Sequence, residues 1–327
     1  MPEPILQVHG LKKRFGDVQA VAGVDFAIEE GEVFGFLGPN GAGKTTTINL
    51  LTGLARPDVG TIHIAGIDCS ANPKAAQHLM GVVPDESNLY PELTGYDNLC
   101  FCGALYGMRK PDREARAREL LDRFGLAGAA GRKFAGYSRG MKRKLTIAAG
   151  IMHQPPILFL DEPTTGIDVA GARQIRQLIA GLCEDRTTIF LTTHYIEEAE
   201  RLCRRIAFIV DGRIVRIDTV ANLMGQAGGR HVMLFTVSDN AAGLCEAMAS
   251  AFAGLRCQTA GGDGIRVESA EAVRVGPLVR FLEDRGAEVA EARILRPSLE
   301  DVFIQITGIE AAVMQRDKER PKNGGGA

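Results

Sequence analysis

Uninterrupted apolar runs that end in polar residues mark the first two thirds of the chain. Residues 157–160, ILFL, are such a run and lead directly into Asp161 and Glu162. Residues 186–194, RTTIFLTTH, repeat the pattern and end in His194. Runs of this length are typical of strands that are buried on both faces of a mostly parallel sheet. Ligands of such sheets bind beyond the carboxyl ends of the strands, so we expect these three polar residues to converge.

The remaining patterns predict two further regions. Between about residues 71 and 154 the apolar positions take a helical spacing, which we interpret as a helical insertion in a sheet domain that covers residues 1–225. A composition shift at residues 224–230 indicates a linker. Residues 230–308 predict the order strand, helix, hairpin, helix, strand, an α+β accessory domain that we expect to be ferredoxin-like. The charged, glycine-rich end, 309–327, is predicted to be disordered.

Composition narrows the classes of function. The chain has 327 residues, which suits one large domain and one small one, and its formal net charge is -2. Acids and bases are interspersed, so no basic field indicates nucleic acid as a partner. The seven cysteines are scattered, which indicates reduced thiols in a cytoplasmic protein. The N-terminus lacks the features of a signal peptide, and no apolar run approaches the roughly 18–20 residues that span a bilayer, so another chain would supply any span.

A phosphate-binding motif follows a short apolar run near the N-terminus. The sequence GPNGAGKT, residues 38–45, matches G-x-x-x-x-G-K-[ST] and leads into a helical segment. Its glycines let backbone N–H groups close around phosphates, Lys44 reaches the terminal two, and the Thr45 hydroxyl can ligate Mg²⁺. The alternative, a mere glycine turn, is disfavoured by the strand-turn-helix context. The candidate nucleotide-binding residues here are Gly38, Pro39, Asn40, Gly41, Ala42, Gly43, Lys44, Thr45 and Thr46.

The acids after the ILFL run supply a second set of candidate groups. Asp161 can hold Mg²⁺ through water, and Glu162 can take a proton from an attacking water. The alternative is that both acids cap a loop before Pro163, and their place directly after the apolar strand disfavours it. His194 could sense or stabilise a γ-phosphate, but a lone histidine is more often structural, so it counts only with its neighbours. The candidate catalytic residues are therefore Lys44, Glu162 and His194, which we expect to converge.

Four motifs, taken together, point to a known family. GPNGAGKT, YSRGM, FLDEPTTGID and TTH, in this order, resemble the phosphate loop, signature, Walker B motif with D-loop, and switch histidine of ATP-binding cassette (ABC) transporter ATPases. The resemblance covers roughly residues 4–225, and the combination of motifs is highly specific. The tail RPSLEDVFIQITG and Met141 in the signature are most similar to ATP-binding subunits of the drug, polyketide and lipid export branch. The resemblance implies an α/β P-loop NTPase cassette that hydrolyses ATP with Mg²⁺.

The resemblance also implies a second copy of the chain as a partner. In that family the signature of one subunit closes over the ATP on the phosphate loop of the other, so that two ATPs lie between two head-to-tail cassettes. Ser138, Gly140 and Met141 would then contact the partner's nucleotide, at the start of a helix whose amino end favours an anion. Without the family, the same stretch is an ordinary capped helix with a solvated basic face. Asp168 matches the D-loop aspartate that links the two sites.

Three positions depart from the family's commonest residues. Phe15 falls where an aromatic, usually tyrosine, stacks on adenine; a phenyl ring keeps the π face, and a core phenylalanine is the alternative. Arg139 replaces a glycine of the signature, and we expect its side chain to point away from the ATP. Asp85 stands where the family usually has glutamine; it could ligate Mg²⁺ but would repel the γ-phosphate. We hypothesise that it slows hydrolysis or alters coupling. The candidate Mg²⁺ ligands are thus Thr45, Asp161 and Asp85.

Three classes of function are open. The leading one is the energy-supplying subunit of a membrane exporter, peripheral at the cytoplasmic face, whose ATP-driven closure moves separate transmembrane permease subunits. The insertion near Leu89, Tyr90 and Tyr96 is the expected docking surface, although ordinary surface packing would give the same pattern. A soluble cassette ATPase that acts on ribosomes or DNA is second, but the tandem cassettes or coiled-coil insertion usual in such relatives do not appear here. A regulatory nucleotide-binding module with little turnover is third, kept open by Asp85.

Overall fold

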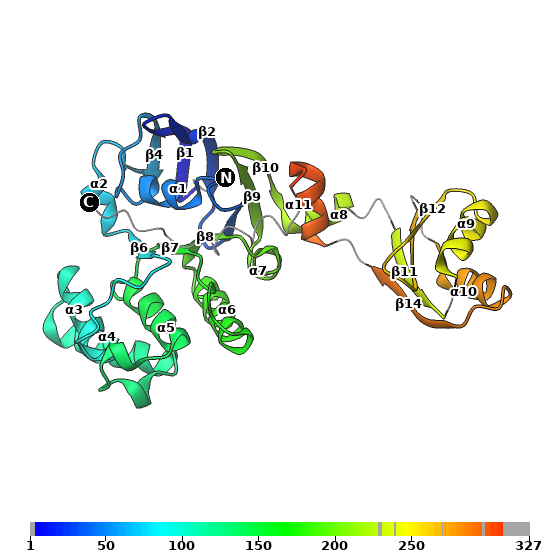
Figure 1. The fold of residues 1–327 in the computed structure, drawn as a ribbon. Helices are drawn as coiled ribbons and strands as arrows, with labels where there is room; N and C mark the ends of the chain where they lie inside the picture. Colours follow the sequence, from blue (N-terminus) through cyan, green and yellow to red (C-terminus); the bar gives the residue numbers. More distant parts are fainter. Residues whose placement is uncertain are drawn as a thin grey trace, which may run out of the picture. The chain divides into compact units, whose positions relative to one another are not determined.

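The computed structural model describes residues 4–227, 231–238, 240–269, 271, 273–295 and 298–309, which form two compact units (Figure 1). The first unit runs to Thr219, and the second covers Val220–Gly308. We propose that they are the sheet domain and the accessory domain expected from the sequence. The predicted disordered tail, apart from its first residue, lies outside the described residues. Within the described part of the chain, no helix combines the length and the apolar character that a membrane crossing requires.

A six-stranded sheet in the order β10-β9-β3-β8-β7-β6 forms the centre of the first unit. All neighbouring pairs are parallel except β10 with β9, so the predicted mostly parallel sheet is confirmed. Every residue of β7 and β8 is buried, as their apolar runs predict. The strands are β3 (Val33–Leu37), β6 (Met80–Val83), β7 (Ile157–Asp161), β8 (Thr188–Thr193), β9 (Arg205–Val210) and β10 (Arg213–Thr219).

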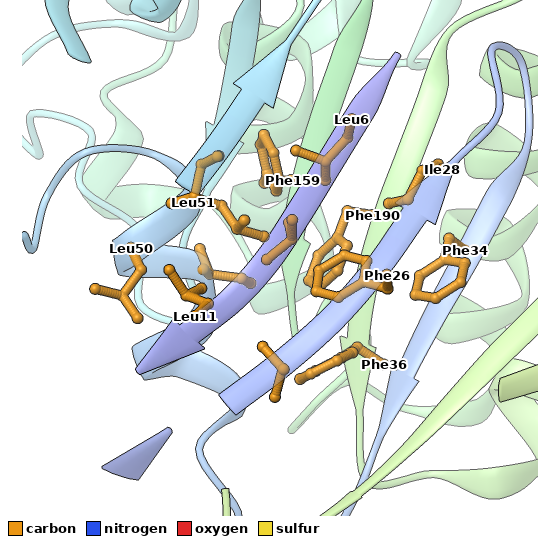
Figure 2. Close-up of a cluster of buried hydrophobic side chains, with 14 of the residues drawn as sticks. Leu6, Leu11, Phe26, Ile28, Phe34, Phe36, Leu50, Leu51, Phe159 and Phe190 are labelled. Carbon is orange, nitrogen blue, oxygen red and sulfur yellow. The ribbon is translucent and has the colours of Figure 1, made fainter. Parts of the chain in front are cut away.

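A second sheet, which the sequence patterns did not predict, shares its core with the first. It is antiparallel, in the order β2-β1-β4-β5. Phe26 of this sheet stacks on Phe34 of the parallel sheet with ring centroids 5.6 Å apart (Figure 2). Leu50 and Leu51 of α1 (Lys44–Leu51) reach the same core, so apolar packing fixes the helix that follows the phosphate loop. The strands are β1 (Leu6–Phe15), β2 (Val18–Ile28), β4 (Val59–Ile64) and β5 (Ile67–Asp68).

The helical insertion consists of packed helices that follow strand β6. The structure differs from the expected start near residue 71, because Met80–Val83 is a strand at the edge of the parallel sheet. Gly81 permits this, since a Cβ on it would lie 2.1 Å from the carbonyl oxygen of Gly150, where α5 ends. The helices of the first unit are α1, α2 (Pro73–Gln77), α3 (Gly95–Leu105), α4 (Lys110–Arg123), α5 (Arg139–Gly150), α6 (Val169–Glu184) and α7 (Ile196–Leu202), with short 3-10 turns at Ala127–Ala129 and Phe134–Gly136.

The second unit contains an antiparallel sheet in the order β12-β13-β11-β14. Buried side chains of α9, α10 and the sheet form one apolar core. The chain order strand, helix, two strands, helix, strand agrees with the predicted elements, and we propose that this sheet and its two helices are a ferredoxin-like domain. The structure differs from the linker predicted at residues 224–230, because the first of these residues belong to α8. The elements are α8 (Val220–Ala227), β11 (His231–Val237), α9 (Ala241–Ala251), β12 (Leu255–Thr259), β13 (Gly264–Ser269), α10 (Val275–Glu283), β14 (Val289–Leu295) and α11 (Leu299–Thr307).

Candidate functional site

The loop between β3 and α1 is shaped by glycines that admit no side chain. A Cβ on Gly38 would lie 2.2 Å from the carbonyl oxygen of Ile209, and one on Gly43 would lie 2.3 Å from that of Ala20. Gly43 also has a φ of 102°, which favours glycine. In this loop the side-chain amide nitrogen of Asn40 is buried without a hydrogen-bond partner. A buried donor beside a helix N-terminus fits a ligand with acceptor oxygens, such as a phosphate.

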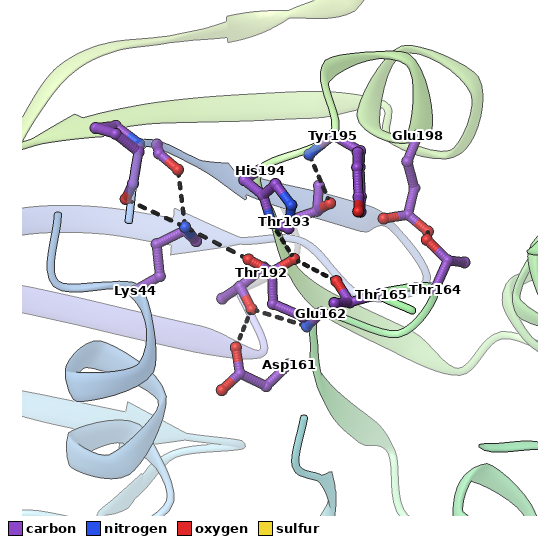
Figure 3. Close-up of polar contacts among 12 residues, drawn as sticks. Lys44, Asp161, Glu162, Thr164, Thr165, Thr192, Thr193, His194, Tyr195 and Glu198 are labelled. Carbon is purple, nitrogen blue, oxygen red and sulfur yellow. Dashed lines mark hydrogen bonds and ion pairs between the residues drawn. The ribbon is translucent and has the colours of Figure 1, made fainter. Parts of the chain in front are cut away.

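Lys44 is held at the carboxyl edge of the parallel sheet. Its ammonium donates to the carbonyl oxygens of Gly38 at 2.8 Å and Pro39 at 3.3 Å, and it lies 3.4 Å from an Oε of Glu162 (Figure 3). The residue is only 6 % exposed. A buried ammonium is costly unless paired, so these contacts keep it in place at the phosphate loop. The predicted convergence of Lys44 with Glu162, the acid directly after β7, is therefore confirmed.

Glu162 and His194 form a buried pair beside the lysine. His194 Nδ1 lies 2.7 Å from Glu162 Oε2, and the Thr165 hydroxyl donates to the same oxygen at 3.1 Å. Burial would raise the pKa of Glu162, but the His194 hydrogen bond and the Lys44 charge outweigh burial and lower this pKa below its usual value. Glu162 is thus a carboxylate at neutral pH, the state that a proton acceptor requires.

Asp161 faces the phosphate loop rather than the histidine. The Thr45 hydroxyl donates to Asp161 Oδ2 at 3.0 Å, and the Thr192 hydroxyl donates to Asp161 Oδ1. Burial raises the pKa of Asp161, with the Glu162 and Asp85 carboxylates adding to the shift and the two hydroxyl donors opposing it. A divalent cation would relieve this charge repulsion. A hydroxyl and a carboxylate are ligands that suit Mg²⁺ when phosphate and water complete its shell, so the donor set fits.

Lys44, Thr45 and Glu162 border one pocket of about 420 Å³, whereas Asp161 and His194 are not among its lining residues. Asp85 lines it, next to the phosphate loop. Phe15 does not line this pocket. Its side chain is 53 % exposed, with the Lys13 ammonium 5.3 Å from the ring centroid, which argues against the alternative that Phe15 is a core residue. Sequence reasoning missed several lining residues, because only their place at strand ends and turns brings them here. The lining residues are Val18, Gln19, Ala20, Asn40, Gly41, Gly43, Lys44, Thr45, Thr46, Asp85, Glu162 and Asp211.

The signature and D-loop residues border a different pocket, of about 480 Å³, that shares no residue with the first. Ser138 caps α5 by accepting from the Met141 N–H at 3.3 Å, and Asp168 caps α6 by accepting from the Gly171 N–H at 2.7 Å. The Arg139 guanidinium donates to the Gly166 carbonyl oxygen at 3.3 Å. The lining residues are Ser138, Arg139, Gly140, Met141, Lys144, Gly166, Ile167, Asp168, Ala170, Gly171 and Gln174.

Comparison of the sequence with known proteins gives a consistent result. Residues 21–165 match the family model described as ABC transporter. The chain is 36 % identical to the linearmycin resistance ATP-binding protein LnrL of Bacillus subtilis, over 93 % of this chain and 98 % of that protein. It is also 36 % identical to the Nod factor export ATP-binding protein I of Paraburkholderia xenovorans, over 95 % of this chain and 99 % of that protein.

Solved structures show the same fold. An ATP-binding cassette dimer in a post-hydrolysis state, bound to ADP and Pi, superposes with a TM-score of 0.61 at 28 % identity, over 66 % of this chain and 98 % of that one. The ATP-binding subunit of an ABC transporter gives a TM-score of 0.62 at 29 % identity, over 68 % of this chain and 93 % of that one. The predicted α/β P-loop cassette is therefore confirmed.

Proposed function

The chain belongs to the ABC transporter family, as an ATP-hydrolysing subunit of its export branch, and we propose that two copies close head to tail on two ATP molecules. The observation that carries this proposal is the separation of the two pockets on one chain. The phosphate-loop pocket holds Lys44 and Glu162, whereas Ser138 and Asp168 border the other pocket, with no residue in common. A second copy, turned head to tail, would bring the two halves together over one nucleotide.

Within each site we propose the following division of work. The phosphate loop and Lys44 bind the phosphates, and Phe15 stacks on the adenine. Glu162 accepts the proton of the attacking water, while His194 orients the Glu162 carboxylate through the 2.7 Å contact between the two side chains. When bound, Mg²⁺ would neutralise charge on the phosphate oxygens, held by Thr45 and Asp161 with Asp85 nearby.

The signature residues act on the nucleotide of the other copy. Ser138, Gly140 and Met141 begin α5, and we propose that the N–H groups there bind the γ-phosphate of the partner's ATP. Asp168 begins α6 beside them and would link the two sites. Arg139, which bonds to Gly166, would not need to contact the nucleotide; its expected direction away from the ATP stays a prediction.

We further propose separate transmembrane permease subunits as partners, with the chain peripheral at the cytoplasmic face of the membrane. The relatives named above are described by linearmycin resistance and by Nod factor export, which favours an exporter. Of the predicted docking residues, Tyr90 is 52 % exposed, but Leu89 is buried and cannot contact a partner directly, and Tyr96 is half-buried. Phe101 and Leu105 of α3 are exposed beside them and extend the proposed surface.

The test is ATP-dependent dimerisation of Glu162→Gln, measured by gel filtration with multi-angle scattering. Glu162→Gln should stall hydrolysis and leave ATP bound, so a dimer should accumulate with ATP and Mg²⁺. Adding Ser138→Arg should abolish the dimer without changing ATP affinity, because Ser138 lies outside the phosphate-loop pocket. A monomer that binds ATP and never dimerises, with or without the membrane chain, would rule the head-to-tail closure out.

Transport itself is tested by co-purification. Expressed with a polytopic membrane chain from the same export system, the protein should co-purify in detergent, and Tyr90→Arg should weaken that association. Recovery with ribosomes or DNA instead of a membrane chain would support the soluble-ATPase alternative.

A further inference from the structure

Arg143 is a buried charged residue that none of the nucleotide-binding motifs explains. It lies in the second turn of α5 and is only 7 % exposed. All three of its guanidinium nitrogens donate hydrogen bonds, and the five acceptors are backbone carbonyl oxygens. A guanidinium used in this way cross-links separate stretches of main chain by hydrogen bonds, rather than forming half of an ion pair.

Three of these hydrogen bonds hold the main chain at the end of β7, where Asp161 and Glu162 lie. Nη2 donates to the carbonyl oxygens of Asp161 at 2.6 Å and Glu162 at 2.7 Å, and Nε donates to that of Pro163 at 2.8 Å. Glu162 has a φ of 50°, a strained conformation for a non-glycine residue that persists only where its surroundings hold it. Arg143 bonds to the carbonyl oxygens on both sides of this turn.

The other two hydrogen bonds hold the main chain directly after β6. Nη1 donates to the carbonyl oxygens of Pro84 and Asp85, the latter at 3.3 Å. A second contact supports the same link, since the hydroxyls of Ser87 and Thr146 lie 2.8 Å apart and join the loop after Asp85 to α5. Both carboxylate-bearing loops of the phosphate pocket are therefore attached to one helix.

Energetics favour arginine at this position. A buried guanidinium is tolerated only when its donors are satisfied, and here carbonyl dipoles satisfy them. Burial lowers the pKa of Arg143, and the nearby carboxylates of Asp85 and Asp161 oppose the shift, so the group stays charged. Each buried carbonyl oxygen left without a donor would destabilise the fold. Lysine, with three donors on one atom, cannot reach acceptors on both strands.

We propose that Arg143 is a positioning residue that ties the signature helix to the hydrolysis site of its own chain. Ser138 caps the same helix, so a side chain of this helix connects the surface offered to the partner's ATP with the backbone of Asp161 and Glu162. The inference rests on the proposed head-to-tail function and deepens it: closure over one ATP would set the geometry that hydrolyses the other.

Arg143→Gln and Arg143→Lys test this proposal, with Lys142→Gln as the matched control. Lys142 is the preceding residue of α5, so its substitution removes the same charge, and its ammonium lies over Phe134, 5.5 Å from the ring centroid, away from both pockets. The readouts are melting temperature, ATP affinity with and without Mg²⁺, kcat and KM, and ATP-driven dimerisation in the Glu162→Gln background.

We expect Arg143→Gln to bind metal-free ATP within about threefold of the parent, because the phosphate loop is untouched. Its kcat should fall about 10–100-fold with little change in KM, since a small misplacement of catalytic groups has that effect. The tightening of ATP binding by Mg²⁺ and the dimer should both be weakened, and Arg143→Lys should recover only part of each. Lys142→Gln should match the parent throughout.

Two results would overturn the proposal. One is an Arg143→Gln protein whose kcat, Mg²⁺ effect and dimer equal those of Lys142→Gln. The other is a loss of kcat that only tracks the fraction unfolded, which would make Arg143 a packing residue. A parent chain that does not dimerise would instead count against the proposed function, and the Mg²⁺ titration would still decide on the link between Arg143 and Asp161. If Arg143→Gln fails to fold, Arg143→Lys carries the same readouts.

Discussion

The first unit has two pockets at helix N-termini, and they differ in how far their own chain completes them. In the phosphate-loop pocket at α1, Lys44 and His194 both contact Glu162, at 3.4 Å and 2.7 Å, and all three side chains are buried. In the signature pocket at α5, Ser138 and Asp168 are exposed and their side chains serve as helix caps.

This difference shows what each pocket can do alone. Charges that neutralise each other can be buried during folding of a single chain, so the first pocket is preformed. A surface of capped helix N-termini attracts an anion but does not enclose it, which agrees with the proposal that the second pocket acts on a ligand carried by another molecule. On the proposed function, binding belongs to one pocket and closure to the other, and substitutions should separate the two.

The largest effect should come from the preformed pocket. Glu162→Gln removes the proton acceptor and keeps its size, so we expect kcat to fall about 10²–10⁴-fold, measured as phosphate release, while ATP remains bound. Because the pKa of Glu162 is lowered, the parent should lose activity through this group only when the pH falls below the usual glutamate value of 4.5.

The exposed Glu197→Gln on α7 is the matched control and should keep the parental rate. If Glu162→Gln hydrolysed ATP at that rate too, the proton acceptor would have to be another group and the preformed pocket would lose its assigned chemistry.

The next effect tests where the preformed pocket ends. Phe15 lies outside its lining, with an exposed ring, so Phe15→Ala should leave the apo protein stable and weaken ATP binding. Loss of stacking worth about 1–3 kcal/mol raises Kd about 5–150-fold, measured by nucleotide titration, and Phe15→Tyr should restore it. Leu54→Ala, at a side chain that is also exposed, is the control. An unchanged Kd for Phe15→Ala would remove Phe15 from the site.

Sequence reasoning could predict the preformed phosphate-loop pocket better than the signature pocket. Lys44, Asp161, Glu162 and His194 each follow an apolar strand, and parallel strands bring their carboxyl ends together, so the pattern alone predicted their convergence. The antiparallel sheet of β1, β2, β4 and β5 was not predicted, because no long apolar run marks it, and Phe15 at the end of β1 was identified through the family resemblance rather than as part of a strand.

Strand β6 and Arg143 were missed for a related reason. Met80–Val83 is too short to stand out from its helical surroundings and is a strand only through pairing with β7. Arg143 lies in a basic run that, in the sequence, has the pattern of a solvated helix face. Only the tertiary structure turns it toward the carbonyl oxygens of Asp161 and Glu162.

A smaller effect concerns the charge of the preformed pocket. Asp85 lines it and contributes to the raised pKa of Asp161, so Asp85→Gln should reduce repulsion of the γ-phosphate. We expect kcat to rise about fivefold, corresponding to roughly 1 kcal/mol, measured at saturating ATP and Mg²⁺. Glu86→Gln, at the adjacent exposed position, is the control. Rates and permease coupling indistinguishable from the parent would sink the hypothesis that Asp85 restrains hydrolysis.

The smallest effect lies in the segment that joins the two pockets, where the Thr164 hydroxyl donates to Glu198 Oε1 at 2.7 Å. Burial raises the pKa of Glu198, so the unfolded chain loses this proton at a lower pH than the folded one, and stability falls as pH rises from the usual value toward the raised one. Glu198→Gln keeps the acceptor for Thr164 and removes the titration. Its melting temperature should exceed the parent's by about 2–4 °C at pH 8, roughly 1 kcal/mol, with a narrower gap at pH 5. Glu197→Gln, at the exposed neighbouring position, should show the same difference in melting temperature from the parent at pH 8 and at pH 5. A gap independent of pH would mean that folding does not raise the pKa of Glu198.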